Sequence, residues 1–316
     1  MGTPRRRDPG IIIAGTALVL VLLMFVFFCG TCFMFSLAFR GAQSRGDGVA
    51  LIEVEGLISA SSGSTGFFDW GVSSESLVDQ LYRAQKDKRV KAVLLRINSP
   101  GGTPAASQEV YEEVRRTARA KPVVVSIGDV GASGAYLVAS AADYIIAAPD
   151  SDVGSIGVIV EIPNISELNR KIGVDYTVIT QGQYKDIGSP LRPVTPEEKA
   201  IITEQAKAAY EHFIKDVAAG RRIDEAKVRE LATGITWPGT QARDLKLIDD
   251  TGNLRDAVEK AGRLGGIKGE VHLIRMESES PFSVFSRFVT AVRELARNVG
   301  LFRGGGGTSQ EYPVKH

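Results

Sequence analysis

Histidine and cysteine are scarce in this chain of 316 residues, which contains three histidines and two cysteines. His212, His272 and His316 lie outside the glycine-rich and turn segments in which catalytic groups are usually presented. No Cys/His spacing typical of a zinc site occurs, and neither a Walker phosphate loop nor a dinucleotide-binding fingerprint is found. A serine nucleophile in this chain would therefore need a base other than histidine, and lysine is the first alternative.

The chain also lacks an excess of positive or negative charge, because its formal net charge is only +1. Binding to nucleic acid needs a concentrated basic surface, so the composition argues against nucleic acid as the main partner. Both cysteines, Cys29 and Cys32, fall inside an apolar stretch, where packing residues are a better interpretation than a redox pair. The rest of the chain then has no disulfide available.

Residues 11–39 form an uncharged, mostly aliphatic stretch that is long enough to span a membrane as a tilted helix. Arg5, Arg6 and Arg7 precede it, which predicts a cytoplasmic N-terminus over residues 1–10. Residues 40–48 are polar and read as a tether to an extracytoplasmic domain. A cleaved signal peptide is the alternative, since Ser36–Ala38 resembles a processing site, but the stretch is about twice as long as a normal signal-peptide core.

Strands and helices are expected to alternate over residues 49–275. The apolar runs are continuous rather than strictly alternating, which is typical of strands covered on both faces. The fold class predicted is α/β, with a mainly parallel sheet built from βαβ units. The expected strands span 49–55, 92–97, 122–127, 143–147, 157–162, 175–179 and 271–274, and the expected helices span 74–86, 105–118, 133–142, 196–219, 224–231, 239–243 and 253–264.

Two features close the chain. Residues 276–303 predict a basic amphipathic helix, which could lie on an anionic membrane or pack on a neighbouring subunit. Residues 304–316 are rich in glycine and polar residues and predict a disordered tail.

A glycine turn, Asn98–Gly102, follows the second expected strand. Because glycines carry no side chain, their N–H groups can bind an oxyanion or pair with an extended peptide. A plain connection from strand to helix and a cradle for phosphate or coenzyme A are the alternatives.

Ser133 lies in the small-residue segment Gly128–Tyr136, where a helix is expected to begin. Its hydroxyl could meet a substrate carbonyl there, with the Gly134 N–H as a second oxyanion donor. The segment is not the Gly-x-Ser-x-Gly elbow, because Gly134 directly follows the serine. Close packing of helix on sheet, with Ser133 only as an N-cap, would explain the same residues.

Lys185 lies in the turn segment Gly182–Pro190 and is the candidate base. An ordinary lysine with a pKa of ~10.4 is almost entirely protonated at neutral pH, so burial would have to lower its pKa to roughly 7–8. Ser155 is a candidate to orient the amine. A solvated lysine is the alternative, and the neighbouring Asp186 favours it.

Taken in order, these segments resemble the signal peptide peptidase A (protease IV) family of the Clp-protease/crotonase superfamily, in its short single-copy form. The resemblance rests on Asn98–Gly102, Ala132–Gly134, Gly154–Gly157, Tyr184–Pro190, Thr195–Glu198 and Gly234–Asp249. It implies a Clp-protease/crotonase-like fold and the following roles: nucleophile Ser133, general base Lys185, oxyanion donors Gly102 and Gly134, and lysine-orienting Ser155. Separately, an extended substrate could add as a strand beside the substrate-binding candidates Gly101, Gly102 and Thr103. One departure is Ala135, where many relatives have glycine.

The resemblance also implies a function, which is degradation of signal peptides left in the bacterial cytoplasmic membrane after their release from secreted proteins. No metal, nucleotide or organic cofactor is implied. The expected partners are peptide substrates, the lipid bilayer and further copies of the chain in a homo-oligomeric ring, with an octamer as one candidate size and with active sites shared between protomers. A crotonase-like acyl-CoA-binding protein and a non-catalytic membrane scaffold are the alternatives.

Overall fold

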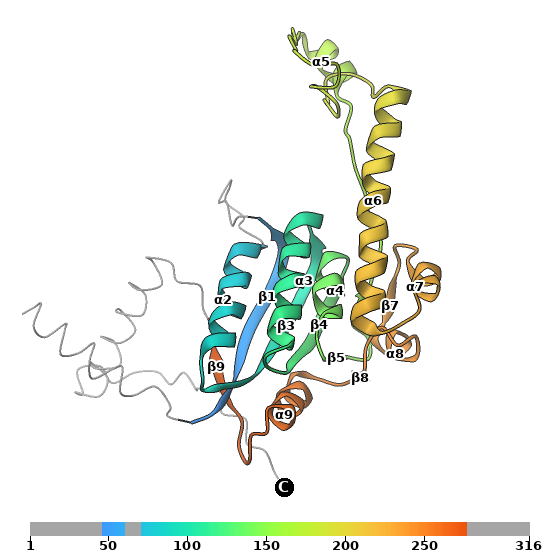
Figure 1. Cartoon of the computed structure of the whole chain (residues 1–316). Coiled ribbons are helices and arrows are strands. Elements are labelled where there is room, and N and C mark those ends of the chain that lie inside the picture. Colours follow the sequence, from blue (N-terminus) through green and yellow to red (C-terminus); the bar gives the residue numbers. More distant parts are fainter. Residues whose placement is uncertain (1–45, 61–70, 277–316) are drawn as a thin grey trace, which may run out of the picture. The chain divides into compact units, whose positions relative to one another are not determined.

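The computed structural model describes residues 46–60 and 71–276 (Figure 1). The predicted cytoplasmic terminus, the apolar stretch 11–39 and most of the tether lie outside the described residues, as do the C-terminal helix and tail from residue 277 on. Within the described ranges, no helix has both the length and the apolar character needed to cross a membrane.

The described residues form a nine-stranded sheet in which every pairing is parallel except one. The main order of strands is β2-β1-β3-β4-β5-β8, with β9 paired to β1 and with β6 paired to β4 and, in the antiparallel sense, to β7. The strands are β1 (Gly48–Ser59), β2 (Gly71–Ser73), β3 (Val90–Gly102), β4 (Val123–Ala132), β5 (Tyr144–Ala147), β6 (Asp152–Gly154), β7 (Thr236–Pro238), β8 (Asp250–Thr251) and β9 (His272–Arg275).

Helices connect these strands, and some of them cover the sheet. They are α2 (Ser74–Lys86), α3 (Pro104–Ala118), α4 (Gly134–Ser140), α5 (Ser166–Ile172), α6 (Pro196–Arg221), α7 (Glu225–Leu231), α8 (Gly239–Asp244) and α9 (Leu254–Leu264). In Figure 1, α2, α3 and α4 lie side by side along one face of the sheet. The long crossovers that join parallel strands make this α/β arrangement the expected one.

Apolar side chains on both faces of the strands hold these layers together. Along β1, Ala50, Ile52 and Val54 belong to the larger core, which also contains residues of α2, α3 and α4. Val49 and Leu51 point to the opposite face, where they join a smaller core with Ala257 and Ala261 of α9. Side chains alternate between the two faces of a strand, so burial on both faces needs the continuous apolar run that the sequence shows.

The helix predicted from Thr195 is confirmed in its capping. The Thr195 hydroxyl accepts from the Glu198 N–H, and the Glu198 carboxylate accepts from the Thr195 N–H. This capping box satisfies two N–H groups that have no partner inside the helix.

Two predicted strands, 157–162 and 175–179, are wrong: neither segment is a strand in the structure. Ile159 is 79% exposed and Ile179 is 86% exposed, so these β-branched residues find no neighbouring strand among the described residues. A short apolar run predicts a strand only where a sheet edge is present to pair with it.

Candidate active site

The carboxyl ends of β3 and β4 carry the predicted catalytic segments. Gly101 and Gly102 end β3, and Ser133 directly follows β4. These strands are neighbours and run parallel, with Ser99 level with Gly131. In open α/β sheets, binding sites form at the carboxyl ends of the strands, so the fold itself brings the glycine turn to the serine.

Ser133 has a backbone conformation that L-residues rarely adopt, with φ 51° and ψ −126°. Its N–H donates to Gly154 O at 2.7 Å, and its carbonyl accepts from Leu137 N, which fixes both sides of the residue. Ser133 is the N-cap of α4, as the alternative interpretation required, yet its side chain makes no capping hydrogen bond. The hydroxyl of this strained, half-buried residue is therefore left available for chemistry.

Gly101, Gly102 and Gly134 pack closely around Ser133. A Cβ added at Gly101 would lie 2.8 Å from the Ser133 Cβ, and one at Gly134 would lie 3.2 Å from the Gly102 backbone nitrogen. The two predicted oxyanion donors, Gly102 and Gly134, are thus neighbours in space. Ser107 packs against Gly134 as well, because a Cβ added at Gly134 would come within 2.1 Å of the Ser107 Oγ.

Ser155 stands beside Ser133 because β4 and β6 run parallel, with Ala132 level with Gly154. Like Ser133 it has φ 51°. Its Oγ donates to Gly234 O at 3.0 Å. The predicted role of Ser155 in orienting a lysine stays a prediction.

A cavity of about 300 Å³ opens at Ser133. Gly102, Ser107 and Gly134 line it near the serine, and α6 contributes His212 and Phe213. Apolar side chains of Leu137, Val158 and Ile159 make up much of the remaining wall. The sequence analysis set His212 aside because it lies outside the turn segments, and it missed Phe213, because nothing in the pattern of this helix shows which of its sides faces the carboxyl ends of the strands.

A second cavity of about 720 Å³ is lined by both Ser133 and Ser155. Lys207 of α6 also lines it and forms an ion pair with Glu204 at 4.0 Å. Lys207 is therefore a lysine near the serine that the sequence did not single out. It provides an internal comparison for Lys185, which borders neither of these two cavities.

Lys185 lies instead at the N-terminal end of α6. The neighbouring residue, Asp186, accepts two hydrogen bonds from Arg192, at 2.8 and 2.9 Å. Arg192 also donates to both carboxylate oxygens of Glu198, at 2.8 and 2.5 Å. These contacts hold the turn that carries Lys185 against the first turn of α6. The Lys185 side chain itself is exposed.

Electrostatics reinforce this attachment. The hydrogen bonds from Arg192 lower the pKa of Glu198 to about 2, and they also lower the pKa of Asp186. Both carboxylates stay ionised at neutral pH, so the bidentate contacts with the guanidinium persist.

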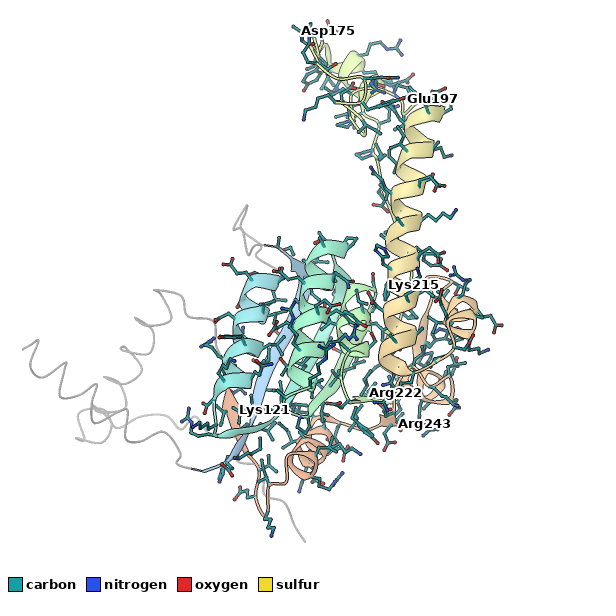
Figure 2. All side chains as sticks on the ribbon, in the orientation of Figure 1. Lys121, Asp175, Glu197, Lys215, Arg222 and Arg243 are labelled. Carbon is teal, nitrogen blue, oxygen red and sulfur yellow. The ribbon has the colours of Figure 1, made fainter. Side chains whose placement is uncertain are left out.

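Within one chain, α6 separates Lys185 from Ser133. Glu198, in the first turn of α6, and His212, at the serine cavity, are fourteen residues apart in one continuous helix. At ~1.5 Å per residue, that distance is about 21 Å along the helix axis. Figure 2 shows Glu197 at one end of α6 and Arg222 at the other.

The predicted substrate-binding segment Gly101–Thr103 is already paired along one edge. Leu57 and Ile58 of β1 lie level with Gly101 and Gly102, and the Thr103 N–H donates to Ile58 O at 2.9 Å. An added substrate strand would need the other edge of the segment. No group of three or more metal-ligating side chains occurs in the described ranges.

Comparison with known proteins decides the family. The model of peptidase family S49 matches residues 115–268, and the Clp protease model matches residues 69–153. A protein of Synechocystis sp. that is named as a protease is 36% identical over 258 residues, which cover 80% of this chain and 88% of that protein. The chain belongs to peptidase family S49. The predicted family and the predicted serine peptidase class are confirmed at this level.

Two other relatives of this S49 chain match over shorter shares of their own length. A protein of Methanocaldococcus jannaschii, also named as a protease, is 41% identical over 192 residues, or 61% of either chain. The chloroplastic serine protease SPPA of Arabidopsis thaliana is 34% identical over 228 residues, which cover 72% of this chain and 34% of the plant protein. The Clp protease match agrees with the mixed α/β, mostly parallel fold seen here.

Proposed function

We propose that the chain is a membrane-anchored serine endopeptidase that degrades remnant signal peptides, with Ser133 as nucleophile and Lys185 as general base. The observation that carries the proposal is the setting of Ser133. Its strained backbone presents a hydroxyl without a capping role beside Gly102 and Gly134, at the mouth of an apolar cavity. Strain of this kind is concentrated at catalytic positions.

The chemistry follows from that setting. An uncharged Lys185 amine takes the proton from the Ser133 hydroxyl as its oxygen attacks the scissile carbonyl carbon. The N–H groups of Gly102 and Gly134 donate to the oxyanion that forms. The lysine then gives its proton to the leaving amine, and water hydrolyses the resulting acyl-enzyme in a second pass through the same groups.

The lysine is proposed to come from a neighbouring protomer of a ring. Two observations support this arrangement: the length of α6 between Lys185 and the serine cavity, and the apolar surface of the segment before α6. Several large apolar side chains there are exposed in one chain, among them Leu168, Ile172, Tyr176, Val178 and Ile179. An exposed apolar patch of this kind marks an interface between proteins.

Association would also solve the problem of the charge on lysine. A lysine acts as a general base only in its uncharged form, which is favoured by removal of the amine from water. In a single chain Lys185 is exposed. A neighbouring subunit that covers it would supply the desolvation and bring it to Ser133 and Ser155.

The proposed substrate suits the cavity. Leu137, Val158 and Phe213 give the wall an apolar character that fits small or aliphatic side chains of an extended peptide. Cleaved signal peptides are apolar and remain in the bilayer. A peptidase held at the outer side of the cytoplasmic membrane by residues 11–39 would meet them without a search through bulk water.

A fluorophosphonate probe, which labels activated serines covalently, tests the assignment in the full-length chain. We expect labelling of Ser133 that is abolished by Ser133→Ala and reduced by at least 100-fold by Lys185→Ala, the typical contribution of a general base. Lys207→Ala is the matched control, since Lys207 lines the second cavity together with Ser133 of its own chain, and this variant should be labelled at close to the normal rate.

Three results would contradict the proposal. Normal labelling of Lys185→Ala together with loss in Lys207→Ala would make Lys207 the base. Loss in His212→Ala, with Lys185→Ala unaffected, would make the histidine in the cavity the base. An acyl-CoA-binding protein or a scaffold would show no labelling of Ser133 in any variant.

A further inference from the structure

Four arginines and two aspartates surround a hollow of about 280 Å³ that lies away from Ser133. We name it the basic hollow and define it by Arg115, Arg119, Asp143, Arg221, Arg222 and Asp249. Ala219 and Gly220, at the end of α6, and Ala141 and Ala142, after α4, form its backbone wall. No step of the proposed peptidase chemistry uses any of these residues.

Both carboxylates of the basic hollow accept hydrogen bonds from the protein, and Asp143 is itself exposed. Asp143 accepts from the Val123 N–H at 2.8 Å. Asp249 accepts from the Ile145 N–H at 2.7 Å and pairs with both terminal nitrogens of Arg221, each at 3.0 Å. The side chain of Arg221 is only 6% exposed, so this ion pair is part of the fold.

The remaining arginines are not balanced. Arg115 reaches Glu112 only at 3.9 Å. Arg119 and Arg222 are exposed, and neither makes an ion pair with any described residue. The basic hollow therefore presents excess positive charge around a concave surface, which is suited to a phosphate group, since guanidinium groups bind phosphate oxygens in pairs.

The position of the basic hollow indicates where such a phosphate would come from. It lies at the edge of the sheet where the parallel strands begin. The register shows that β1 and β4 begin at the same edge, because Ala50 of β1 is level with Val93 of β3, and Val93 is level with Val123 at the start of β4. Two strand spacings, about 10 Å, separate the starts of β1 and β4. Figure 2 shows Lys121 and Arg222 at this same end of the domain.

The chain enters the domain at that edge from the apolar stretch 11–39. Residues 40–47 span at most about 27 Å when fully extended. A membrane that holds the apolar stretch would therefore lie within reach of the edge that carries the basic hollow. Anionic lipids attract basic residues near the membrane surface.

We propose that the basic hollow binds the phosphate of an anionic phospholipid headgroup and so sets this edge of the domain on the membrane surface. The inference rests on the anchor in the proposed function, but not on the catalytic assignment.

Native mass spectrometry of the delipidated full-length chain in mild detergent tests the proposal, with phosphatidylglycerol and phosphatidylcholine of matched acyl chains as probes. The informative variant is Arg119→Gln/Arg222→Gly. Arg222 has φ 54°, a left-handed conformation that glycine adopts without strain, so the second change removes charge at little risk to the fold. The matched control, Lys199→Gln/Lys215→Gln, removes two exposed charges from α6 outside the basic hollow.

We expect the double arginine variant to weaken the tightest phosphatidylglycerol binding by roughly 30-fold, with no effect on phosphatidylcholine, and the lysine control to bind normally. Equal phosphatidylglycerol binding by wild type and arginine variant, or equal losses in the arginine and lysine variants, would overturn the proposal. Displacement of the lipid by inorganic phosphate at matched concentration would overturn the lipid assignment in favour of a free anion. Ser133→Ala should bind phosphatidylglycerol as wild type does, because the lipid proposal does not involve the nucleophile. Loss of the expected Ser133 labelling with intact lipid binding would therefore overturn the peptidase proposal alone, and intact labelling without lipid binding would overturn this one alone.

Discussion

Gly134→Ala is the substitution whose effect follows most directly from the geometry around the nucleophile. The added methyl group would lie 2.1 Å from the Ser107 Oγ and 2.9 Å from its Cβ. Ser107 is fully buried, so the clash cannot be relieved by swinging the side chain into solvent. Overpacking of this kind costs about 1–3 kcal/mol.

A second substitution tests whether the clash with Ser107 causes the loss of stability. Ser107→Gly removes both atoms that the methyl group meets, so the double variant Gly134→Ala/Ser107→Gly should recover most of the stability lost in Gly134→Ala. Each glycine in a helix costs roughly 1 kcal/mol relative to alanine, and the exchange moves one glycine from α4 to α3, so this term nearly cancels. The predicted coupling energy between the two sites is therefore close to the overpacking term, about 1–3 kcal/mol.

Thermal unfolding of the full-length chain in detergent, followed by near-ultraviolet circular dichroism, measures the effect. For a domain of this size, 1 kcal/mol shifts the midpoint by about 2–4 °C. The overpacking term of Gly134→Ala corresponds to a fall of about 2–12 °C in the midpoint, and the roughly 1 kcal/mol that alanine gains over glycine in a helix offsets part of it. The labelling of Ser133 should also slow, since the Gly134 N–H moves with the start of α4. A raised midpoint for Gly134→Ala, or no coupling between the two sites in the double variant, would refute this account of the packing beside the nucleophile.

Two further predictions concern the attachment of the Lys185 turn to α6. Arg192→Gln should release this turn, because Arg192 joins Asp186 to Glu198. Ser133 labelling should then fall with little change in the unfolding midpoint. The control is Arg229→Gln, which removes an exposed ion pair elsewhere, and equal labelling of the two variants would count against the role of Arg192. The attachment should also depend on pH. The pKa of Glu198 is about 2 in the folded protein, below its ordinary value, so the stabilisation is complete above that ordinary value and is lost as the pH falls towards 2. Hydrogen exchange of residues 183–191, corrected for the intrinsic pH dependence of exchange, should show constant protection from pH 5 to pH 8 and a loss towards pH 2, whereas a loss between pH 8 and pH 5 would contradict the assigned cause.

The fold could largely be predicted from the sequence, because its signals are local. Apolar runs separated by helices predict a parallel sheet, and Thr195 with Glu198 predicts the start of α6, which the structure confirms. The strands expected at 157–162 and 175–179 were wrong for a reason that the sequence does not contain. Whether an apolar run becomes a strand depends on a partner edge, and the described residues provide none for these segments.

The candidate site was predictable in part for the same reason. Gly102, Ser133 and Gly134 come together because each follows or begins an element at the carboxyl edge of one sheet. Phe213 and Lys207 were missed, and His212 was set aside, because they lie within a helix, where spacing does not show which side meets the cavity. The position of Lys185 at the far end of α6 depends on the length of that helix and on the contacts of Arg192 with Asp186 and Glu198, which the local sequence pattern does not show.

Complementation between inactive subunits tests the central claim, that Ser133 of one protomer works with Lys185 of another. Ser133→Ala and Lys185→Ala chains are each expected to be inactive, since each lacks one of the two groups. Co-assembled in equal amounts and mixed at random, they should recover about a quarter of the wild-type number of labelled or active sites, because one neighbour pair in four unites an intact serine with an intact lysine. Mixed assemblies, verified by mass, that remain as inactive as either parent would show that the two residues do not meet across protomers.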